Sequence, residues 1–221
     1  MKLQKVLSRL QKLHPKEIDL SLDRIKSICN KLNNPQDDLK CIQVCGTNGK
    51  FGTIQALRAI LKEAGYKCNI YTSPHIKKIN ERFVYNDKII NDNDLAKLLI
   101  EIEKVNNGDP LTYFEALTAA FFLGCRKYKN NLVLAEFGLF GRFDAVNILK
   151  RNVANIITSI SVDHQDWLPK GDRGISRIIY EKTSFLLNSK IIVAKQNSEK
   201  INKNIKMCLK KNSANKIFYG K

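Results

Sequence analysis

The sequence predicts an α/β fold, in which a parallel β-sheet carries helices on both faces and a helical N-terminal arm precedes it. Three observations lead to this prediction. Short runs of almost wholly apolar residues alternate with segments of helical periodicity, a pattern typical of parallel strands buried on both sides. One strand-like run ends directly in the loop 46–50 (GTNGK), and an amphipathic helix follows it. The chain of 221 residues is long enough to bury its own core.

The first 40 residues predict the helical arm. Apolar residues recur at helical spacing from Val6 to Leu13, Pro15 interrupts the pattern, and it resumes from Leu20 to Leu32. From Cys41 the pattern changes to strand-like runs. We therefore expect an arm at 1–40 and an α/β domain at 41–221.

The rest of the chain predicts alternating strands and helices. Strands are expected at 41–45, 67–72, 132–136, 153–158, 190–194 and 216–219. Helices are expected at 53–64, 92–105, 114–128 and 196–211. The polar, turn-rich segment 73–90 is expected to be a loop.

Charge is the most unusual bulk property, because 38 Lys and Arg residues against 21 Asp and Glu residues give a formal net charge of +17. The lysines are dispersed and aromatic residues do not interleave with them, which argues against a nucleic-acid interface. A compositional bias or a solvated face explains the charge, and attraction for small anionic substrates is an alternative. Charge alone does not decide among these functions.

The six cysteines are scattered, with no CxxC pair and no histidine at ligand spacing. They are Cys29, Cys41, Cys45, Cys68, Cys125 and Cys208. We interpret them as small buried hydrophobic residues rather than as zinc ligands. The sequence has neither a signal-like N-terminus nor an apolar run of about 18 residues. A cytoplasmic location without membrane contact is expected.

The strand–GTNGK–helix junction predicts an anion-binding loop. The backbone N–H groups of such a loop converge on one point, the helix N-terminus adds partial positive charge, and Lys50 adds a full charge. The spacing is close to G-x-x-x-x-G-K-[ST], with Val44 at the first glycine position. The junction therefore predicts a nucleoside triphosphate site, although a helix cap with a chance lysine gives the same local pattern.

Further blocks follow in order, and together they resemble the Mur-ligase superfamily in its folate branch, the bifunctional dihydrofolate synthases/folylpolyglutamate synthases. The blocks are GTNGK at 46–50, YTSPH at 71–75, NER at 80–82, LTYFE at 111–115, EFGLFGRFDAVN at 136–147, TSISVDHQDW at 158–167, EK at 181–182, and HPKEIDL at 14–20 in the arm. The similarity covers almost all of the chain. It implies a P-loop sheet of the Mur-ligase central-domain type.

The resemblance also implies a reaction. Enzymes of this family use ATP and Mg²⁺ to phosphorylate a carboxylate of dihydropteroate or folate, and the amine of L-glutamate then attacks the acyl phosphate. Such chemistry needs the triphosphate held, its charge neutralised, and the carboxylate placed in line with the γ-phosphate. The chain is therefore expected to be an ATP-dependent acid–amino-acid ligase of folate biosynthesis and polyglutamylation.

Individual residues receive roles from the resemblance alone. The ATP-binding residues would be Gly46, Thr47, Asn48, Gly49 and Lys50, with the N–H groups of 47–49 on the β- and γ-phosphates. The metal ligands would be Ser73 and Glu136 for one Mg²⁺ and His164 for a second. The catalytic residues would be His164 and Lys182, the latter matching the family's carbamylated lysine. The residues around the pterin would be Phe114 and Asp144.

Each of these positions has a structural alternative. Ser73 could shape a turn before proline, Glu136 could pair with Arg142, His164 could be a neutral hydrogen-bonded side chain, and Lys182 could be a surface lysine on a helix. His14 and His75 fall in motif blocks, and we expect both of them to have a structural role.

Four residues depart from the family pattern: Phe51 and Gly52 after the phosphate-loop lysine, Phe140 in the 136–147 block, and Val146 beside Asn147. The resemblance also implies a C-terminal glutamate-binding domain, which we expect to be absent from this chain. Three hypotheses remain open: a ligase of impaired activity, alone or with a separately encoded C-terminal half; a non-catalytic remnant from an interrupted gene; and a basic P-loop protein that binds nucleic acid.

Overall fold

A computed structural model describes residues 3–13, 19–186, 190–211 and 216–220 of the protein. The side chains of residues 211 and 216 lie outside the description, as does most of the HPKEIDL block, including His14. None of the helices in these ranges combines the length and the hydropathy that a membrane-spanning segment needs.

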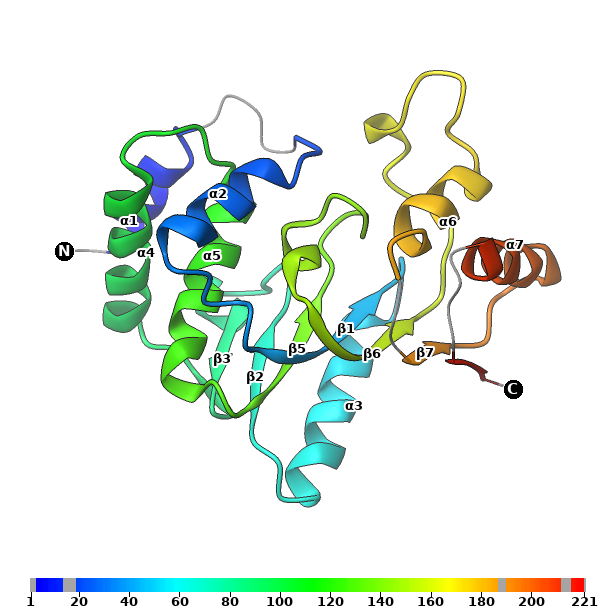
Figure 1. Cartoon of the computed structure of the whole chain (residues 1–221), viewed down its shortest axis with the longest axis horizontal. Helices are drawn as coiled ribbons and strands as arrows, with labels where there is room; N and C mark the ends of the chain where they lie inside the picture. The colour runs from blue at the N-terminus through cyan, green and yellow to red at the C-terminus, as the bar shows by residue number, and fades with distance from the viewer. Residues whose placement is uncertain (1–2, 14–18, 187–189, 212–215, 221) are drawn as a thin grey trace.

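The molecule is built on one eight-stranded sheet with the order β4-β3-β2-β5-β1-β6-β7-β8 (Figure 1). The strands are β1 (Lys40–Cys45), β2 (Cys68–Tyr71), β3 (Phe83–Tyr85), β4 (Lys88–Ile89), β5 (Leu132–Glu136), β6 (Arg151–Ile157), β7 (Lys190–Val193) and β8 (Lys216–Tyr219). The six expected strands all form, and they pair in parallel. Almost every residue of β1, β2 and β5 is buried, as expected for covered parallel strands.

The expectation of a loop at 73–90 is wrong for its second half. This segment contains a short helix η1 (Ile79–Arg82) and the hairpin of β3 and β4, which extends the sheet antiparallel to β2. Asn86 and Asp87 connect the two strands with φ of 51° and 65°, the left-handed pair that a two-residue hairpin turn requires. The sequence pattern did not predict these strands, because β3 has three residues and β4 has two, and polar turn residues surround them.

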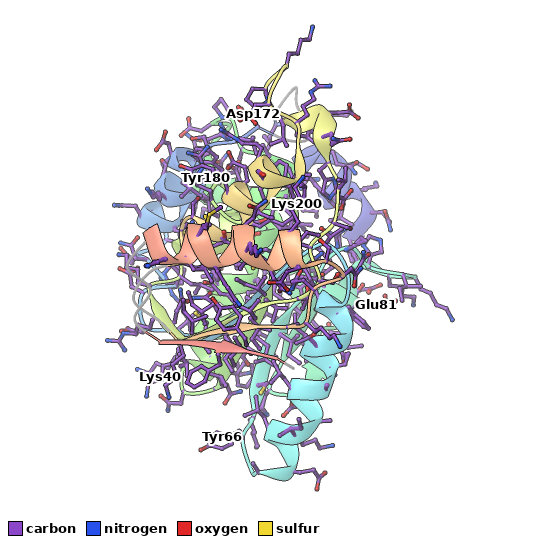
Figure 2. All side chains as sticks on the ribbon, turned by 90° about the vertical axis from the view of Figure 1, so that its right-hand side faces the viewer. Lys40, Tyr66, Glu81, Asp172, Tyr180 and Lys200 are labelled. Atoms are coloured by element: carbon purple, nitrogen blue, oxygen red, sulfur yellow. The ribbon has the colours of Figure 1, made fainter. Side chains whose placement is uncertain are left out.

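Helices cover the sheet unequally. The phosphate loop leads into α3 (Lys50–Glu63), which packs on one face (Figure 1). The other face carries α1 (Leu3–Leu10), α2 (Asp23–Lys31), α4 (Asp92–Asn106), α5 (Tyr113–Cys125), α6 (Ile175–Thr183) and α7 (Glu199–Lys211). Figure 2 shows α7 and α3 on opposite sides of the strands. Helix α6 was not among the expected elements.

The N-terminal helices contribute to the main core. Val6 and Leu10 of α1 and Ile25 and Ile28 of α2 belong to the same buried cluster as α4 and α5. The helical spacing of these residues therefore marks the face that packs on α4 and α5. Helices α1 and α2 therefore pack on the helices of that face rather than extending away from the rest of the molecule.

The parallel strands all end at the same edge of the sheet, and the predicted site residues lie there. The carboxyl end of β1 leads into Gly46, that of β2 into Ser73, and that of β5 ends at Glu136. Connections of open α/β sheets form ligand sites at this edge. The fold therefore brings three of the sequence blocks to one side of the molecule.

Candidate active site

The loop after β1 has the backbone of a phosphate-binding loop. Gly46 has φ of +143°, and a Cβ there would lie 2.0 Å from Oγ1 of Thr158, so only glycine fits against β6. Gly49 has φ of +86° and precedes the first residue of α3. Both glycines are required by the backbone, which explains their spacing in the sequence.

Two of the amide groups expected to face phosphate are already engaged. The N–H groups of Thr47 and Asn48 donate to the carbonyl of Ser159, at 2.8 and 3.2 Å. The hydroxyl of Thr47 also bonds with the backbone of Ser161. The loop is thus fastened to the segment after β6, and the remaining donor among the three expected amides is that of Gly49.

Lys50 lies at the start of α3 with its side chain folded back over the loop. Its Nζ donates to the carbonyls of Gly46 and Thr47, at 3.3 and 3.2 Å. The same Nζ lies 3.8 Å from Oε1 of Glu136. The ammonium group therefore points across the loop toward the end of β5.

Glu136 and Ser73 meet beside Lys50. The N–H of Ser73 donates to Oε2 of Glu136 at 3.1 Å. Burial raises the pKa of Glu136, and the Ser73 N–H and Lys50 oppose that shift. The alternative that Glu136 pairs with Arg142 does not hold, because Arg142 pairs with Glu181.

These groups line a cleft of about 560 Å³, which we call the loop cleft. Its lining includes Thr47, Asn48, Gly49, Lys50, Phe51, Ser73, Pro74, Ile76 and Glu136. Phe51 is half exposed within this lining. The structure therefore brings together the predicted ATP-binding residues and two of the three predicted metal ligands.

A second cavity of about 290 Å³ adjoins it, which we call the apolar cavity. Its lining is Asp19, Leu20, Ser73, Pro74, Arg82, Thr112, Phe114, Glu115, Gly138, Leu139, Phe140, Phe143, Asp144, Ala145 and His164. Ser73 and Pro74 belong to both cavities. The predicted pterin residues Phe114 and Asp144 thus line the same cavity, and Ser73 and Pro74 lie between this cavity and the loop cleft.

Asp144 is a buried carboxylate held by three backbone amides. Oδ2 accepts from Gly138 and Leu139, and Oδ1 accepts from Val146. Burial raises its pKa to about 6, and the three hydrogen bonds oppose that shift. Asp144 therefore fixes the 138–146 loop and presents a group that changes protonation near neutral pH.

His164 lies in the apolar cavity rather than the loop cleft. It adopts a left-handed backbone with φ of 53°, its Nε2 lies 3.2 Å from Asp163, and its ring meets Phe140 edge-on. Burial lowers its pKa, and Asp163 opposes that shift. His164, the predicted ligand of a second Mg²⁺, thus lines the same cavity as Ser73, and the charges of Lys182 and Lys50 also contribute to lowering its pKa.

Lys182 is buried, so the alternative of a surface lysine is wrong. Its Nζ donates to the carbonyls of Gly46 and Leu139, at 3.2 and 2.8 Å. Burial lowers its pKa to about 8, and the nearby charge of Lys50 adds to the shift. Helix α6 therefore places an amine that loses its proton readily between the phosphate loop and the 138–142 loop.

Glu181 anchors that helix. It accepts a two-pronged bond from Arg142 and a third from Arg177, and its backbone carbonyl accepts from Gly141 and Arg142. Sequence reasoning named Glu181 only as part of a motif block. A buried carboxylate between two arginines has no local signal, because its partners lie on different elements.

The departures from the family pattern have different structural consequences. Phe140 is buried against His164 and Lys182, and it does not have a positive φ, so its backbone carries no strain there. Val146 is also fully buried. A Cβ on Gly52 would meet nothing within 4 Å. Of these residues, only Phe51 lines the loop cleft.

The donor set at Glu136 and Ser73 fits Mg²⁺ better than zinc. One carboxylate and one hydroxyl lie together, and Mg²⁺ takes few protein oxygens while keeping phosphate and water ligands. Among the described residues no group of three His, Cys, Asp or Glu side chains could hold a metal by itself. The described cysteines are free, and five of the six are buried.

Comparison with curated proteins finds relatives over most of the chain. Dihydrofolate synthase/folylpolyglutamate synthase of Escherichia coli (strain K12) is 37% identical over 171 residues, covering 77% of this chain and 40% of that protein. The Haemophilus influenzae protein of the same name is 38% identical over 192 residues, covering 86% of this chain and 43% of that protein. No protein-family model matches the chain.

Solved structures agree with these relatives. E. coli FolC in complex with DHPP and ADP superposes with a TM-score of 0.86 at 30% identity, covering 99% of this chain and 51% of that one. The Yersinia pestis bifunctional enzyme with AMPPNP and Mn gives 0.86 at 29% identity, covering 99% and 52%. The chain thus spans about half the length of the proteins it matches, and over most of its own length it is homologous to the dihydrofolate synthases/folylpolyglutamate synthases.

Proposed function

We propose that this chain forms the nucleotide- and acid-binding part of an ATP-dependent ligase that joins L-glutamate to dihydropteroate or a folate. One observation carries the proposal: the loop cleft and the apolar cavity share the wall of Ser73 and Pro74. A triphosphate over the phosphate loop and an acid in the apolar cavity would therefore meet at that wall. The ligands of solved relatives, which include DHPP, ADP and L-glutamate, support this assignment.

The reaction has two steps. A carboxylate oxygen of the acid attacks the γ-phosphorus, the bond from γ-phosphorus to the bridging oxygen breaks, and ADP leaves. The amine of glutamate then attacks the acyl carbon, the C–O bond to phosphate breaks, and the amine gives up its proton as the amide forms. Positioning and charge stabilisation supply most of the catalysis in phosphoryl transfer.

The residues of the loop cleft would handle the phosphate charge. Lys50 would turn from the loop carbonyls to the β- and γ-phosphates. Glu136 and Ser73 would hold Mg²⁺, which neutralises phosphate charge when bound. Since Thr47 and Asn48 donate to Ser159, we propose that the free N–H groups at Gly49 and the start of α3 make the first phosphate contacts.

The other predicted residues would act from the apolar cavity and α6. Phe114 would pack on the pterin, and Asp144 would accept hydrogen bonds from its amino group. Lys182, with its lowered pKa, would be available for carbamylation, which needs a neutral amine. His164 would lie beside the acid at the shared wall. The complete ligase in this proposal includes the part of the relatives' length that this chain does not span, in one polypeptide or as a separate subunit.

Nucleotide binding tests the first half of the proposal. We expect ADP with Mn²⁺ to bind in calorimetry, and Lys50→Ala to weaken binding at least about tenfold, since it removes a charge-assisted contact to phosphate. Lys62→Ala, at the far end of the same helix and exposed, is the matched control. Equal binding by Lys50→Ala and wild type would show that the loop is not the nucleotide site.

A second candidate is nucleotide binding without ligation. Phe51 in the lining of the loop cleft favours it, because a phenyl ring there narrows the space beside the phosphates. ADP release from ATP that requires both dihydropteroate or tetrahydrofolate and L-glutamate supports the ligase. ADP binding without such release supports the second candidate.

A further inference from the structure

Arg82, the last residue of the NER block, is a cation in the lining of the apolar cavity, and the resemblance assigned it no role. It ends η1 at the point where β3 begins, and it shares the cavity wall with Ser73, Phe114 and Asp144. Most of that wall is apolar, with Leu20, Pro74, Phe143 and Ala145 among its residues. Arg82 is partly buried in this wall, and burying an arginine away from water costs free energy unless it meets an anion.

The other arginines of the chain show how unusual this is. Among the described residues, seven of them pair with a carboxylate, namely Arg9, Arg24, Arg58, Arg142, Arg151, Arg173 and Arg177. Arg126 donates to the carbonyl of Leu32. Arg82 lines the apolar cavity, and within the same described ranges it forms no ion pair with a carboxylate. The charge of this partly buried guanidinium group is therefore available for a ligand.

The geometry of Arg82 leaves its outer donors free. Nε donates to Nδ1 of His75 at 3.0 Å, which directs the guanidinium plane. The loop that carries His75 is itself held, because the carboxylate of Glu81 accepts from the N–H groups of Ile76, Lys77 and Lys78. The two Nη groups therefore remain to form the paired bonds that suit a carboxylate.

The carboxylates in the lining of the same cavity have partners other than Arg82. Asp144 accepts from three backbone amides. Glu115 accepts from Arg24 and from the N–H of Thr112, and Asp19 also pairs with Arg24. A ligand that entered this cavity with a carboxylate would find its counter-ion in Arg82.

Arg82 also lies near the proposed nucleotide site. Its positive charge opposes the rise in the pKa of Glu136 that burial causes, so it lies within electrostatic range of the loop cleft. Ser73 and Pro74, which form the shared wall, line both cavities. An anion bound by Arg82 would thus lie at the boundary where phosphoryl transfer is proposed.

We propose that Arg82 is a substrate-binding residue that holds the reacting carboxylate of the acid through its Nη groups at the Ser73–Pro74 wall, with His75 as its positioning residue. This inference rests on the proposed ligase function. Arg82 would orient one carboxylate oxygen toward the γ-phosphorus, and it would stabilise the charge of the acyl phosphate after ADP has left.

The test compares two ligands that differ only in the carboxylate. Pteroate and 6-(anilinomethyl)pterin share the pterin and the aniline ring, and only pteroate carries the acid. Binding of each is measured by fluorescence or calorimetry for the wild type, Arg82→Gln, Arg82→Lys and Arg151→Gln. Arg151 is a matched control, because it is an exposed arginine at the start of β6, whereas the candidate site lies beyond the end of that strand. ADP binding and the melting temperature are measured for every variant.

We expect Arg82→Gln to weaken pteroate binding by roughly 10- to 100-fold, as for a lost charge-assisted pair, and to leave 6-(anilinomethyl)pterin unchanged. Arg82→Lys should restore part of the loss, and Arg151→Gln should bind both ligands like the wild type. Equal losses for both ligands, or no loss for pteroate, would overturn the role of Arg82 while the ligase proposal stands. Wild-type protein that binds ADP but neither pteridine would overturn the acid site of the proposed function and this inference with it.

Discussion

At the scale of single residues, the buried ammonium of Lys182 is the most informative feature. It is held by two carbonyls and lies near a second lysine, and burial in this position disfavours its charged form. A lysine with a lowered pKa is typical of a functional position. The same feature makes the stability of the protein depend on pH in a way that can be measured.

We predict that the wild type gains stability relative to Lys182→Met as pH rises from 7 to 10. The pKa of Lys182 is about 8 in the folded protein against 10.5 for the free side chain, so between these values the unfolded chain binds more protons and stability rises with pH. The relative gain should be roughly 2–3 kcal/mol. Urea denaturation at several pH values measures it, and Lys200→Met on α7 is an exposed control.

A flat difference between wild type and Lys182→Met across this range would contradict the prediction. It would mean that the pKa of Lys182 is the same in the folded and the unfolded protein, so that the ammonium group stays charged in the fold. In that case the amine would not be available for carbamylation near neutral pH, and the proposed role of Lys182 would fail with it.

At the scale of elements, helix α6 is joined to the 138–142 loop through Glu181 and Lys182. Glu181 is buried and forms ion pairs with Arg142 of the loop and with Arg177 of its own helix. The next residue on that helix is Lys182. The connection therefore fixes both the loop that shapes the apolar cavity and the lysine that reaches the phosphate loop.

We predict that Arg142→Gln destabilises the protein by roughly 1.5–3 kcal/mol, because it leaves a buried carboxylate with one arginine in place of two. Arg173→Gln should change stability by less than about 0.5 kcal/mol, since the Asp166 partner of Arg173 is almost wholly exposed. Urea denaturation measures both variants. Equal effects of the two substitutions would show that Glu181 does not hold the loop.

At the scale of the whole molecule, the N-terminal helices and the sheet form one core. Leu10 of α1 is almost fully buried in the cluster that also contains residues of α4, α5 and β5. The opposite face of the sheet is covered mainly by α3, and Ile192 and Phe218 near the β8 edge are partly exposed. Stability of the site should therefore depend on residues far from it.

We predict that Leu10→Ala lowers the free energy of unfolding by roughly 2–5 kcal/mol, and that it shifts the unfolding curves followed by circular dichroism and by fluorescence of Trp167 together. Lys5→Ala on the exposed side of α1 should change little. If Leu10→Ala altered the circular dichroism without moving the fluorescence curve, α1 would unfold separately from the rest.

The sequence by itself determined the parallel strands, most helices, the glycine positions of the phosphate loop and the family blocks. These features depend on neighbouring residues, because strand and helix periods and a positive φ at glycine are local. The blocks also identified Lys50, Ser73 and Glu136 in advance, and the fold brings them together because parallel strands end at one edge.

Only the tertiary structure decided how the site residues pair. Lys182 bonds to Gly46 across 136 positions of sequence, Glu181 takes the arginine that was an alternative partner for Glu136, and Ser159 occupies two amides of the phosphate loop. It also decided that Arg82 lines the apolar cavity and that 83–89 is a hairpin. Such pairings depend on which segments meet in space, and charge or spacing along a single chain does not specify a partner more than a hundred residues away.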